Sequence, residues 1–172
     1  MAHRRPPCDP DRPFDLGAEL IAKRHPALIP VARDHHECLI FAQRLMRGTK
    51  ASDKDWPSEP VQQAAMLVAF FERHLRQHFR IEEEIVFPAA CSAGGEAENL
   101  VSQLLDEHRE MVDLVERLAA NPQVAAAELA AFGQLLNDHI RLEDRQLFPL
   151  METRMPAEAL LDLQEQVEAR YS

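Results

Sequence analysis

An internal repeat limits most strictly what this sequence can fold into. The segment from His78 to Pro88 matches the segment from His139 to Pro149 without a gap, and each shared residue is offset by 61 positions. Both segments contain a His-x-x-x-Glu pair, and Phe-Pro begins five residues after each glutamate. A repeat of this kind predicts two similar structural units that share one core.

A second, looser match precedes the two segments. Asp34-His35 aligns with Glu107-His108, and apolar residues follow both histidines at the third, fourth, seventh and tenth positions. Aligning His36 instead would place a glutamine on this apolar stripe, so His35 is the predicted inward histidine and His36 the alternative. Each half of the repeat therefore contributes one lone histidine and one His-x-x-x-Glu pair.

The composition and the breaks in the sequence predict an all-α protein. Hydrophobic residues make up 46% and aromatic residues only 6%, which favours packed helices over a sheet. Proline and glycine leave core helices at about 29–47, 60–87, 96–120 and 122–151, and a further helix at about 156–170. Short connections favour antiparallel neighbours, and hence an up-down-up-down four-helix bundle with an extra C-terminal helix.

The chain length of 172 residues fits one domain. Residues 1–14 are rich in proline and basic residues, so we expect a flexible, irregular N-terminal arm, with a helical turn or two within 16–24. The single domain then spans 15–172, with the core bundle at about 29–151. The apolar stripe of the last helix should cover an open edge of the bundle, and it could also pair two copies in a homodimer.

The charge and hydropathy exclude several classes of partner. A net charge of −10 argues against nucleic acid, because phosphate-binding surfaces need a surplus of lysine and arginine. No apolar run approaches the ~18 residues that span a membrane, and the polar beginning of the chain carries no apolar signal segment. These features predict a soluble cytoplasmic protein.

The spacing of the repeated polar residues predicts a metal site. Residues four apart on a helix point into the same space, so each His-x-x-x-Glu pair offers two ligands on one face. An isolated pair of this type usually lies on a solvated surface, but apolar and aromatic residues surround both pairs here. Burying four histidines and two carboxylates is costly unless they share hydrogen bonds or bind a cation. The predicted ligands are His35, His78, Glu82, His108, His139 and Glu143.

The ligand types narrow the choice of metal. Imidazole and carboxylate suit iron, manganese or zinc, while the irregular spacing of Cys8, Cys38 and Cys91 fits neither a thiolate site nor a disulfide framework. Two carboxylates can bridge two metals. The positive charge of two ferrous ions slightly exceeds the negative charge of two glutamates and a bridging hydroxide, and neutral histidines tolerate this small excess. We therefore expect two Fe ions with an oxo or hydroxo bridge, with Zn or Mn as substitutes.

These residues resemble the hemerythrin family, specifically the hemerythrin-like HHE cation-binding domain. The family pattern is a lone histidine, then His-x-x-x-Glu, then both again, with Phe-Pro after each pair, and it is matched in order over about residues 29–151. The resemblance implies an antiparallel bundle with a carboxylate-bridged di-iron centre that can meet dioxygen or related small oxidants.

The sequence departs from the oxygen-carrying branch of that family. The branch is expected to have a second histidine four residues after the histidine that corresponds to His108, where this chain has Val112. His74, four residues before His78, could supply a fifth nitrogen or support the ligands from outside. The branch also uses an aspartate at the position of Asp144, an alternative to Glu143, which the repeat favours. The neighbouring acids are otherwise expected to be solvated or to support the ligands: Glu83, Glu84 and Asp144.

The ligand set gives three functional hypotheses and no residue with a predicted catalytic role. It is richer in nitrogen than that of ferritin-like di-iron proteins, which favours a protein that binds or senses dioxygen, nitric oxide or peroxide. The second hypothesis is a di-iron enzyme that decomposes peroxide or donates iron to damaged iron centres, although repair proteins of the family are expected to carry a longer N-terminal domain. The third is a metal-free structural or interaction bundle with hydrogen-bonded interior histidines.

Overall fold

A computed structural model describes residues 24–48, 51, 54–123 and 126–171. Every regular element in these ranges is helical, as the composition predicted. The predicted arm at 1–14 lies outside the described residues, and so does the expected turn at 16–24 apart from Arg24. Within the described ranges, no helix is long and apolar enough to cross a bilayer.

The first long helix has the predicted bounds. A short 3-10 turn, η1 (Pro26–Leu28), leads into α2 (Ile29–Arg47). Proline is well tolerated in the first turn of a helix because the first N–H groups have no partner within it. Gly48 ends the helix at φ 52°, where its N–H bonds back to carbonyls of the last turn. A residue without Cβ adopts this positive φ without strain.

The second pass of the chain is a continuous helix with two π-helical turns. Its elements are α3 (Pro60–Phe70), η3 (Phe71–Leu75), α4 (Arg76–Ile81), η4 (Glu82–Val86), α5 (Phe87–Ala90) and the 3-10 turn η5 (Cys91–Ala93). The α-helical part ends three residues beyond the predicted end at residue 87. The π turns were not predicted.

The third and later helices follow the breaks in the sequence, with one correction. Their elements are α6 (Gly95–Ala120), α7 (Ala126–Leu142), the π turn η6 (Glu143–Leu147), α8 (Phe148–Arg154) and α9 (Ala157–Tyr171). The predicted start of the fourth helix at Pro122 is wrong, because residues 121–123 are not helical. The side chain of Asn121 instead accepts the N–H of Gln123, a local bond that favours a turn over a helix.

Two of the π turns, η4 and η6, begin at equivalent positions of the repeat. The N–H of Phe87 bonds to the carbonyl of Glu82, and the N–H of Phe148 bonds to that of Glu143. A proline follows each phenylalanine, and inside an α-helix its ring would crowd the preceding turn. A widened π turn lets the helix continue past such a residue. The duplication therefore extends from the side chains to the backbone.

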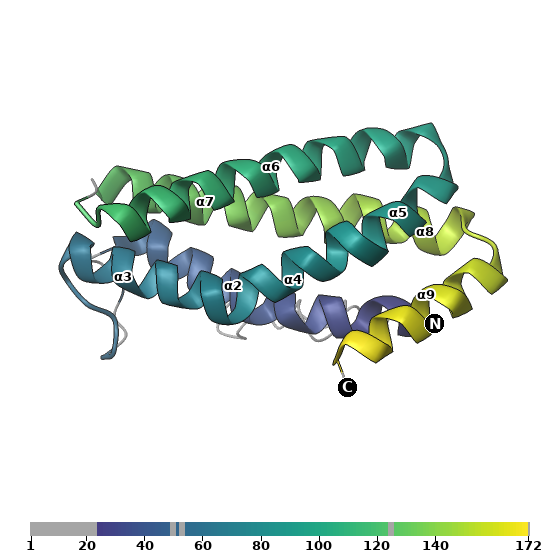
Figure 1. The fold of residues 1–172 in the computed structure, drawn as a ribbon, viewed down its shortest axis with the longest axis horizontal. Coiled ribbons are helices and arrows are strands. Elements are labelled where there is room, and N and C mark those ends of the chain that lie inside the picture. The colour runs from purple at the N-terminus through teal and green to yellow at the C-terminus, as the bar shows by residue number, and fades with distance from the viewer. Residues whose placement is uncertain (1–23, 49–50, 52–53, 124–125, 172) are drawn as a thin grey trace, which may run out of the picture.

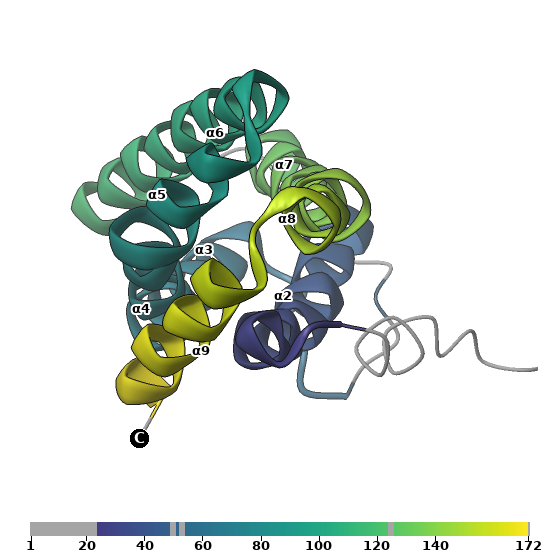
Figure 2. The ribbon, with the colours of Figure 1, turned by 90° about the vertical axis from the view of Figure 1, so that its right-hand side faces the viewer.

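Figure 1 shows the chain passing back and forth along the long axis of the molecule. α2 packs along α7, and α3 packs along α6. Figure 2 shows α9 on the outside of this arrangement, where it contacts η1 and η4. The apolar stripe of α9 is buried against the bundle through Leu160, Leu163 and Val167.

A glycine allows the close contact between α2 and α7. A Cβ atom added to Gly133 would lie 2.6 Å from the carbonyl oxygen of Ala42 and 2.9 Å from the Cβ atom of Leu45. Real Cβ atoms do not approach that closely, so any larger residue would push the two helices apart. The absence of a side chain here sets the spacing of two helices that both carry polar residues of the repeat.

The hydrophobic core is divided into two clusters by a polar layer. On α2, Val31 and Ala32 belong to one cluster, Cys38 and Phe41 belong to the other, and the buried His35 lies between them. The other three passes show the same order of apolar, polar and apolar residues. Apolar packing on both sides therefore holds the polar layer in the middle of the bundle.

Candidate metal centre

The six side chains predicted as ligands all lie in this buried layer. None exposes more than 2% of its surface. The histidines come from α2, α4, α6 and α7, and the glutamates are the first residues of the π turns η4 and η6. Below, the first half-site denotes His35 and His78, and the second half-site denotes His108 and His139.

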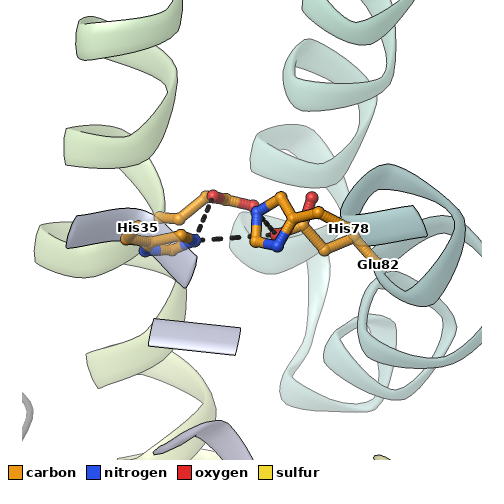
Figure 3. Close-up of side chains that lie close together, drawn as sticks. His35, His78 and Glu82 are labelled. Carbon is orange, nitrogen blue, oxygen red and sulfur yellow. Dashed lines mark ion pairs between the residues drawn. The ribbon is translucent and has the colours of Figure 1, made fainter. Parts of the chain in front are cut away.

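Glu82 lies between the two half-sites. Its Oε1 atom is 2.9 Å from Nε2 of His78 and 3.7 Å from Nε2 of His35. Figure 3 shows the rings of these two histidines converging on the glutamate from different helices. Its Oε2 atom is 3.3 Å from Nε2 of His108. One carboxylate therefore touches both half-sites, the arrangement that a bridging ligand requires.

Glu143 makes a second contact of this kind. Its Oε2 atom is 3.3 Å from Nε2 of His35 and 3.7 Å from Nε2 of His139. Two sets of ligand atoms, each within 4.8 Å of one another, could hold a metal ion. One set is His35, His78, Glu82 and Glu143, and the other is Glu82, His108 and His139. Because Glu82 belongs to both sets, two ions held here would share it.

Each histidine is also held from outside by a carboxylate on another helix. Nδ1 of the histidine and the carboxylate oxygen are 2.8–3.3 Å apart in all four cases. The pairs are His35 with Asp144, His78 with Asp34, His108 with Glu83, and His139 with Glu107. Such partners fix the orientation of the ring and strengthen it as a metal ligand.

The outer carboxylates lie at equivalent positions of the repeat, although their pairing with the histidines was not predicted. Asp34 and Glu107 each precede a lone histidine, while Glu83 and Asp144 each follow a paired glutamate. Glu83 and Asp144 were predicted to be solvated or supporting residues, whereas no role was predicted for Asp34 or Glu107. The available signal was an acid recurring at equivalent positions of both halves.

The outer pairs determine which ring nitrogen is free. A carboxylate can only accept a hydrogen bond, so each Nδ1 atom donates and the neutral ring has its lone pair on Nε2. The Nε2 atoms of His108 and His139 lie 3.1 Å apart. Two lone pairs at this distance repel each other unless a proton or a metal ion lies between them. The second half-site is therefore built to share a cation.

Buried atoms without hydrogen bonds point to the same conclusion. They include Nε2 of His35 and His78 and both carboxylate oxygens of Glu82 and Glu143. Polar atoms left unpaired in a protein interior are rare and costly. Metal coordination would satisfy them, and the imidazole and carboxylate donors fit iron, manganese or zinc.

Without a metal, the carboxylates favour protonated histidines. Burial alone disfavours imidazolium, but the charge of Glu82 and the contacts with Asp34 and Glu82 together outweigh it and raise the pKa of His78 to about 9. Burial likewise opposes the effect of Asp144 and Glu143, which raise the pKa of His35 well above its usual range. Burial also opposes the charge of His78, which holds the pKa of Glu82 well below its usual range. In the metal-free protein, protons thus supply the positive charge that the cluster requires.

The pKa values of His108, Asp34 and Glu107 reflect the same balance between burial and neighbouring charges. Burial lowers the pKa of His108, but the neighbouring carboxylates of Glu82 and Glu83 outweigh burial and raise it. Burial likewise opposes the bonds to histidine that lower the pKa values of Asp34 and Glu107. Asp34 and Glu107 therefore stay ionised when a histidine donates to them.

Aromatic rings shield the cluster from solvent. Phe79 stacks on His108 with ring centroids 3.7 Å apart, and Phe148 stacks on His35 at 5.6 Å. Both phenylalanines are almost completely buried. Apolar rings on both sides keep water away from the ligand atoms and strengthen electrostatic contacts inside the cluster.

The other histidine and cysteine candidates lie away from the inner layer. His36 is exposed, while His35 faces the cluster. His74 lies outside both sets of ligand atoms, with 46% of its side chain exposed and Nδ1 3.8 Å from Oε2 of Glu37. Cys38 is buried and free, and burial raises the pKa of its thiol to about 12, so it stays protonated.

Asp144, the alternative to Glu143, lies outside the inner layer and contacts Nδ1 of His35. Arg24 holds this aspartate by donating to its backbone carbonyl, with its guanidinium 3.7 Å from the carboxylate. The same guanidinium is 3.3 Å from Glu152 and 5.4 Å from the ring centre of Phe148. A buried arginine therefore stabilises the carboxylate that orients His35.

The sequence profile of the hemerythrin HHE cation-binding domain matches residues 30–151 of this chain. That range contains all six inner side chains and the four outer carboxylates, and it leaves out Arg24 and α9.

Uncharacterized proteins of Mycobacterium bovis and of two strains of Mycobacterium tuberculosis are 33% identical to the chain over 75 residues. The matched segment covers 42% of this chain and 44% of each relative, so the chain spans less than half the length of the curated relatives that it matches. No match was found among the solved structures.

Proposed function

Because the chain belongs to the hemerythrin family through its HHE cation-binding domain, we propose that its buried histidines and glutamates hold two iron ions. The observation that carries the proposal is the set of inward Nε2 and carboxylate atoms left without hydrogen bonds. Two sets of ligand atoms that share Glu82 suit two ions bridged by carboxylates. The proposal includes a single domain over residues 15–172 with an antiparallel up-down-up-down bundle at its core.

We further propose that this centre binds or senses dioxygen, nitric oxide or peroxide. A cavity of about 150 Å³ reaches His78, where it is lined by Asp34, Cys38 and His74 among others. Pockets for drug-sized organic molecules are about 300–1,000 Å³, so this cavity favours a ligand of a few atoms. The nitrogen-rich ligand set favours ligand binding over oxygenation of an organic substrate.

The side chains of this chain have separate tasks in the proposal. The four histidines and two glutamates hold the ions, and the outer carboxylates orient the rings by accepting the Nδ1 protons. Phe79 and Phe148 exclude water beside the histidines. Iron supplies an open coordination position and electron transfer when it is bound.

Anaerobic reconstitution tests the proposal. Protein loaded with ferrous iron under argon should retain about two irons per chain after desalting, and adding dioxygen, nitric oxide or peroxide should change its visible absorption. His35→Gln should lose iron, whereas the matched control His36→Gln, on the exposed face, should retain it. Retention of far fewer than two irons, or spectra that no oxidant changes, would contradict the proposal.

The metal-free alternative makes the opposite prediction. If the histidines were only hydrogen-bonded, replacing His78 and His139 by Gln should change thermal stability by the same amount with and without metal. Metal ligands instead contribute binding free energy to folding, so metal should stabilise the natural chain and not the double variant. Differential scanning calorimetry with and without ferrous iron separates the two cases.

A further inference from the structure

The outer carboxylates Asp34 and Glu107 occupy equivalent places in the repeat but have different second partners. Oε1 of Glu107 accepts a hydrogen bond of 2.8 Å from Gln103, which lies one turn earlier on the same helix. The position one turn before Asp34 is Pro30, which has no donor. Asp34 therefore cannot be held from within its own helix in this way.

Tyr171 fills that role from the last turn of α9. Its hydroxyl donates to Oδ2 of Asp34 at 2.6 Å, and the same oxygen faces Nδ1 of His78 at 3.3 Å. An O–H···O bond of this length to a carboxylate is charge-assisted and strong. Burial, together with the charge of Asp34, raises the pKa of Tyr171, so the phenol keeps the proton that it donates.

The position of Tyr171 is set by the packing of α9. The apolar stripe of this helix is buried in the bundle core, and the helix contacts η4, the π turn that begins with Glu82. At the end of α9, Arg170 bonds to Oε2 of Glu84 at 2.8 Å. The buried stripe therefore sets the position of the last turn, because the pair of Arg170 and Glu84, with side chains 41% and 42% exposed, contributes little.

Asp34 needs such a partner because its side chain is 40% exposed. A carboxylate at the surface can turn toward water and leave the imidazole that it supports, and ordering it costs side-chain entropy. The hydroxyl of Tyr171, as a second donor beside His78, holds the side chain of Asp34 in one rotamer. The ring of His78 then keeps its Nε2 atom directed at the inner layer.

We propose that Tyr171 is a positioning residue of the metal centre, which acts through Asp34 on His78. The inference rests on the proposed function, because it requires a metal ion at the first half-site. It assigns α9, which lies outside the matched HHE domain, a part in metal binding. Tyr171 touches neither the ligand atoms nor a metal, so its effect must pass through the carboxylate.

Thermodynamic linkage gives the proposal a second consequence. The Tyr171 contact strengthens metal binding by a certain factor. Bound metal then strengthens the docking of the last turn of α9 by the same factor, because the coupling free energy is the same in both directions. Metal at the first half-site therefore protects the end of α9 against local opening. A tyrosine with a purely structural role would not produce this coupling.

Cobalt titration of the full chain under argon provides the test, because the visible spectrum of Co²⁺ depends on its ligand geometry. Tyr171→Phe removes only the hydroxyl and should weaken the binding of one of two Co²⁺ ions by about threefold to tenfold. This is less than the 10- to 100-fold loss typical of a direct partner of a ligand. Asp34→Asn should remove the effect of Tyr171→Phe in a double-mutant cycle.

Two controls separate this effect from a general disturbance of α9. Arg170→Gln removes the contact with Glu84 from the same turn and should leave both Co²⁺ affinities and the spectrum unchanged. Hydrogen exchange should show that Co²⁺ protects amides at the end of α9 in the natural chain and not in Tyr171→Phe.

The outcomes distinguish the two proposals. If the natural chain binds fewer than two Co²⁺ ions, both the metal centre and this inference fail. If it binds two, but Tyr171→Phe keeps the same affinities, spectrum and amide protection, only the role of Tyr171 is overturned. Loss of affinity in Tyr171→Phe, abolished in the Asp34→Asn background, supports it.

Discussion

The two half-sites use the same inner side chains but are held differently from outside. In the first, Arg24 and Tyr171 hold the supporting carboxylates, and both residues lie outside the matched HHE domain. In the second, Glu107 is held by Gln103 of its own helix. The two halves therefore contribute the same types of inner side chain, whereas the supports of the first half-site depend on segments outside the repeat.

A duplicated fold can therefore become asymmetric without a change in the residues that it contributes as ligands. Duplication supplies both halves with the same histidines, glutamates and outer acids. Segments that flank the repeat can contact only the half that they pack against, so they change the supports of that half alone. The two ions that we propose should therefore differ in affinity, and the following predictions test that comparison.

The largest expected effect comes from Glu82, which belongs to both sets of ligand atoms. Glu82→Gln should remove both ions, because the amide carries no charge and offers one acceptor atom in place of two. Glu143→Gln should mainly weaken the first half-site, since Glu143 belongs to that set alone. Iron per chain after reconstitution measures both effects. If Glu82→Gln retained two irons per chain, Glu82 would not be a ligand that both ions require.

A large effect is also expected from pH in the metal-free protein. The pKa of His78 is about 9 in the folded chain and about 6.5 when unfolded. The raised pKa stabilises the fold fully below pH ~6.5, and this contribution, roughly 3 kcal/mol, is lost as pH rises toward 9. Urea unfolding at a series of pH values measures the decline.

Metal should remove this decline, because a coordinated imidazole no longer binds a proton at Nε2. The loaded protein should therefore show a flatter pH dependence between pH 6.5 and 9, and metal uptake near neutral pH should release protons. If folding stability depended on pH in the same way with and without metal, the cluster would not be a cation-binding site.

The outer carboxylates should show the asymmetry directly. Asp144→Asn should weaken metal binding by about 10- to 100-fold at the first half-site, and Glu107→Gln should do so at the second. Isothermal titration with Co²⁺ should resolve two affinities that change separately. The control is Glu37→Gln, whose side chain is 67% exposed and which should change neither. Equal loss at both half-sites in each variant would show that the supports act on the cluster as a whole.

The smallest expected effect concerns the packing of α2 on α7. Gly133→Ala should lower the free energy of unfolding by about 1–2 kcal/mol, because the new Cβ atom overlaps the carbonyl of Ala42. Gly95→Ala is the matched control, since a Cβ atom there meets nothing within 4 Å. Thermal unfolding compares the two. If Gly133→Ala were neutral, the close approach of these helices would not depend on the glycine.

Much of the fold could be predicted because its signals are local. The bounds of α2 follow from proline near its start and Gly48 at its end. The π turns were missed because hydrophobic periodicity does not report a single widened turn, although Pro88 and Pro149 marked their places. The start of the fourth helix was misplaced because Pro122 suits a helix start, while the side-chain bond of Asn121 favours a turn.

The all-α fold and the six ligand-type side chains at equivalent places could be predicted from the amino-acid sequence, because a repeat and a four-residue spacing are patterns along the chain. Which acid supports which histidine became known from the packed fold. The pairing of His35 with Asp144 joins residues 109 positions apart, and that of Tyr171 with Asp34 joins residues 137 apart. Such contacts depend on how the helices pack against one another, which the spacing along one helix does not specify.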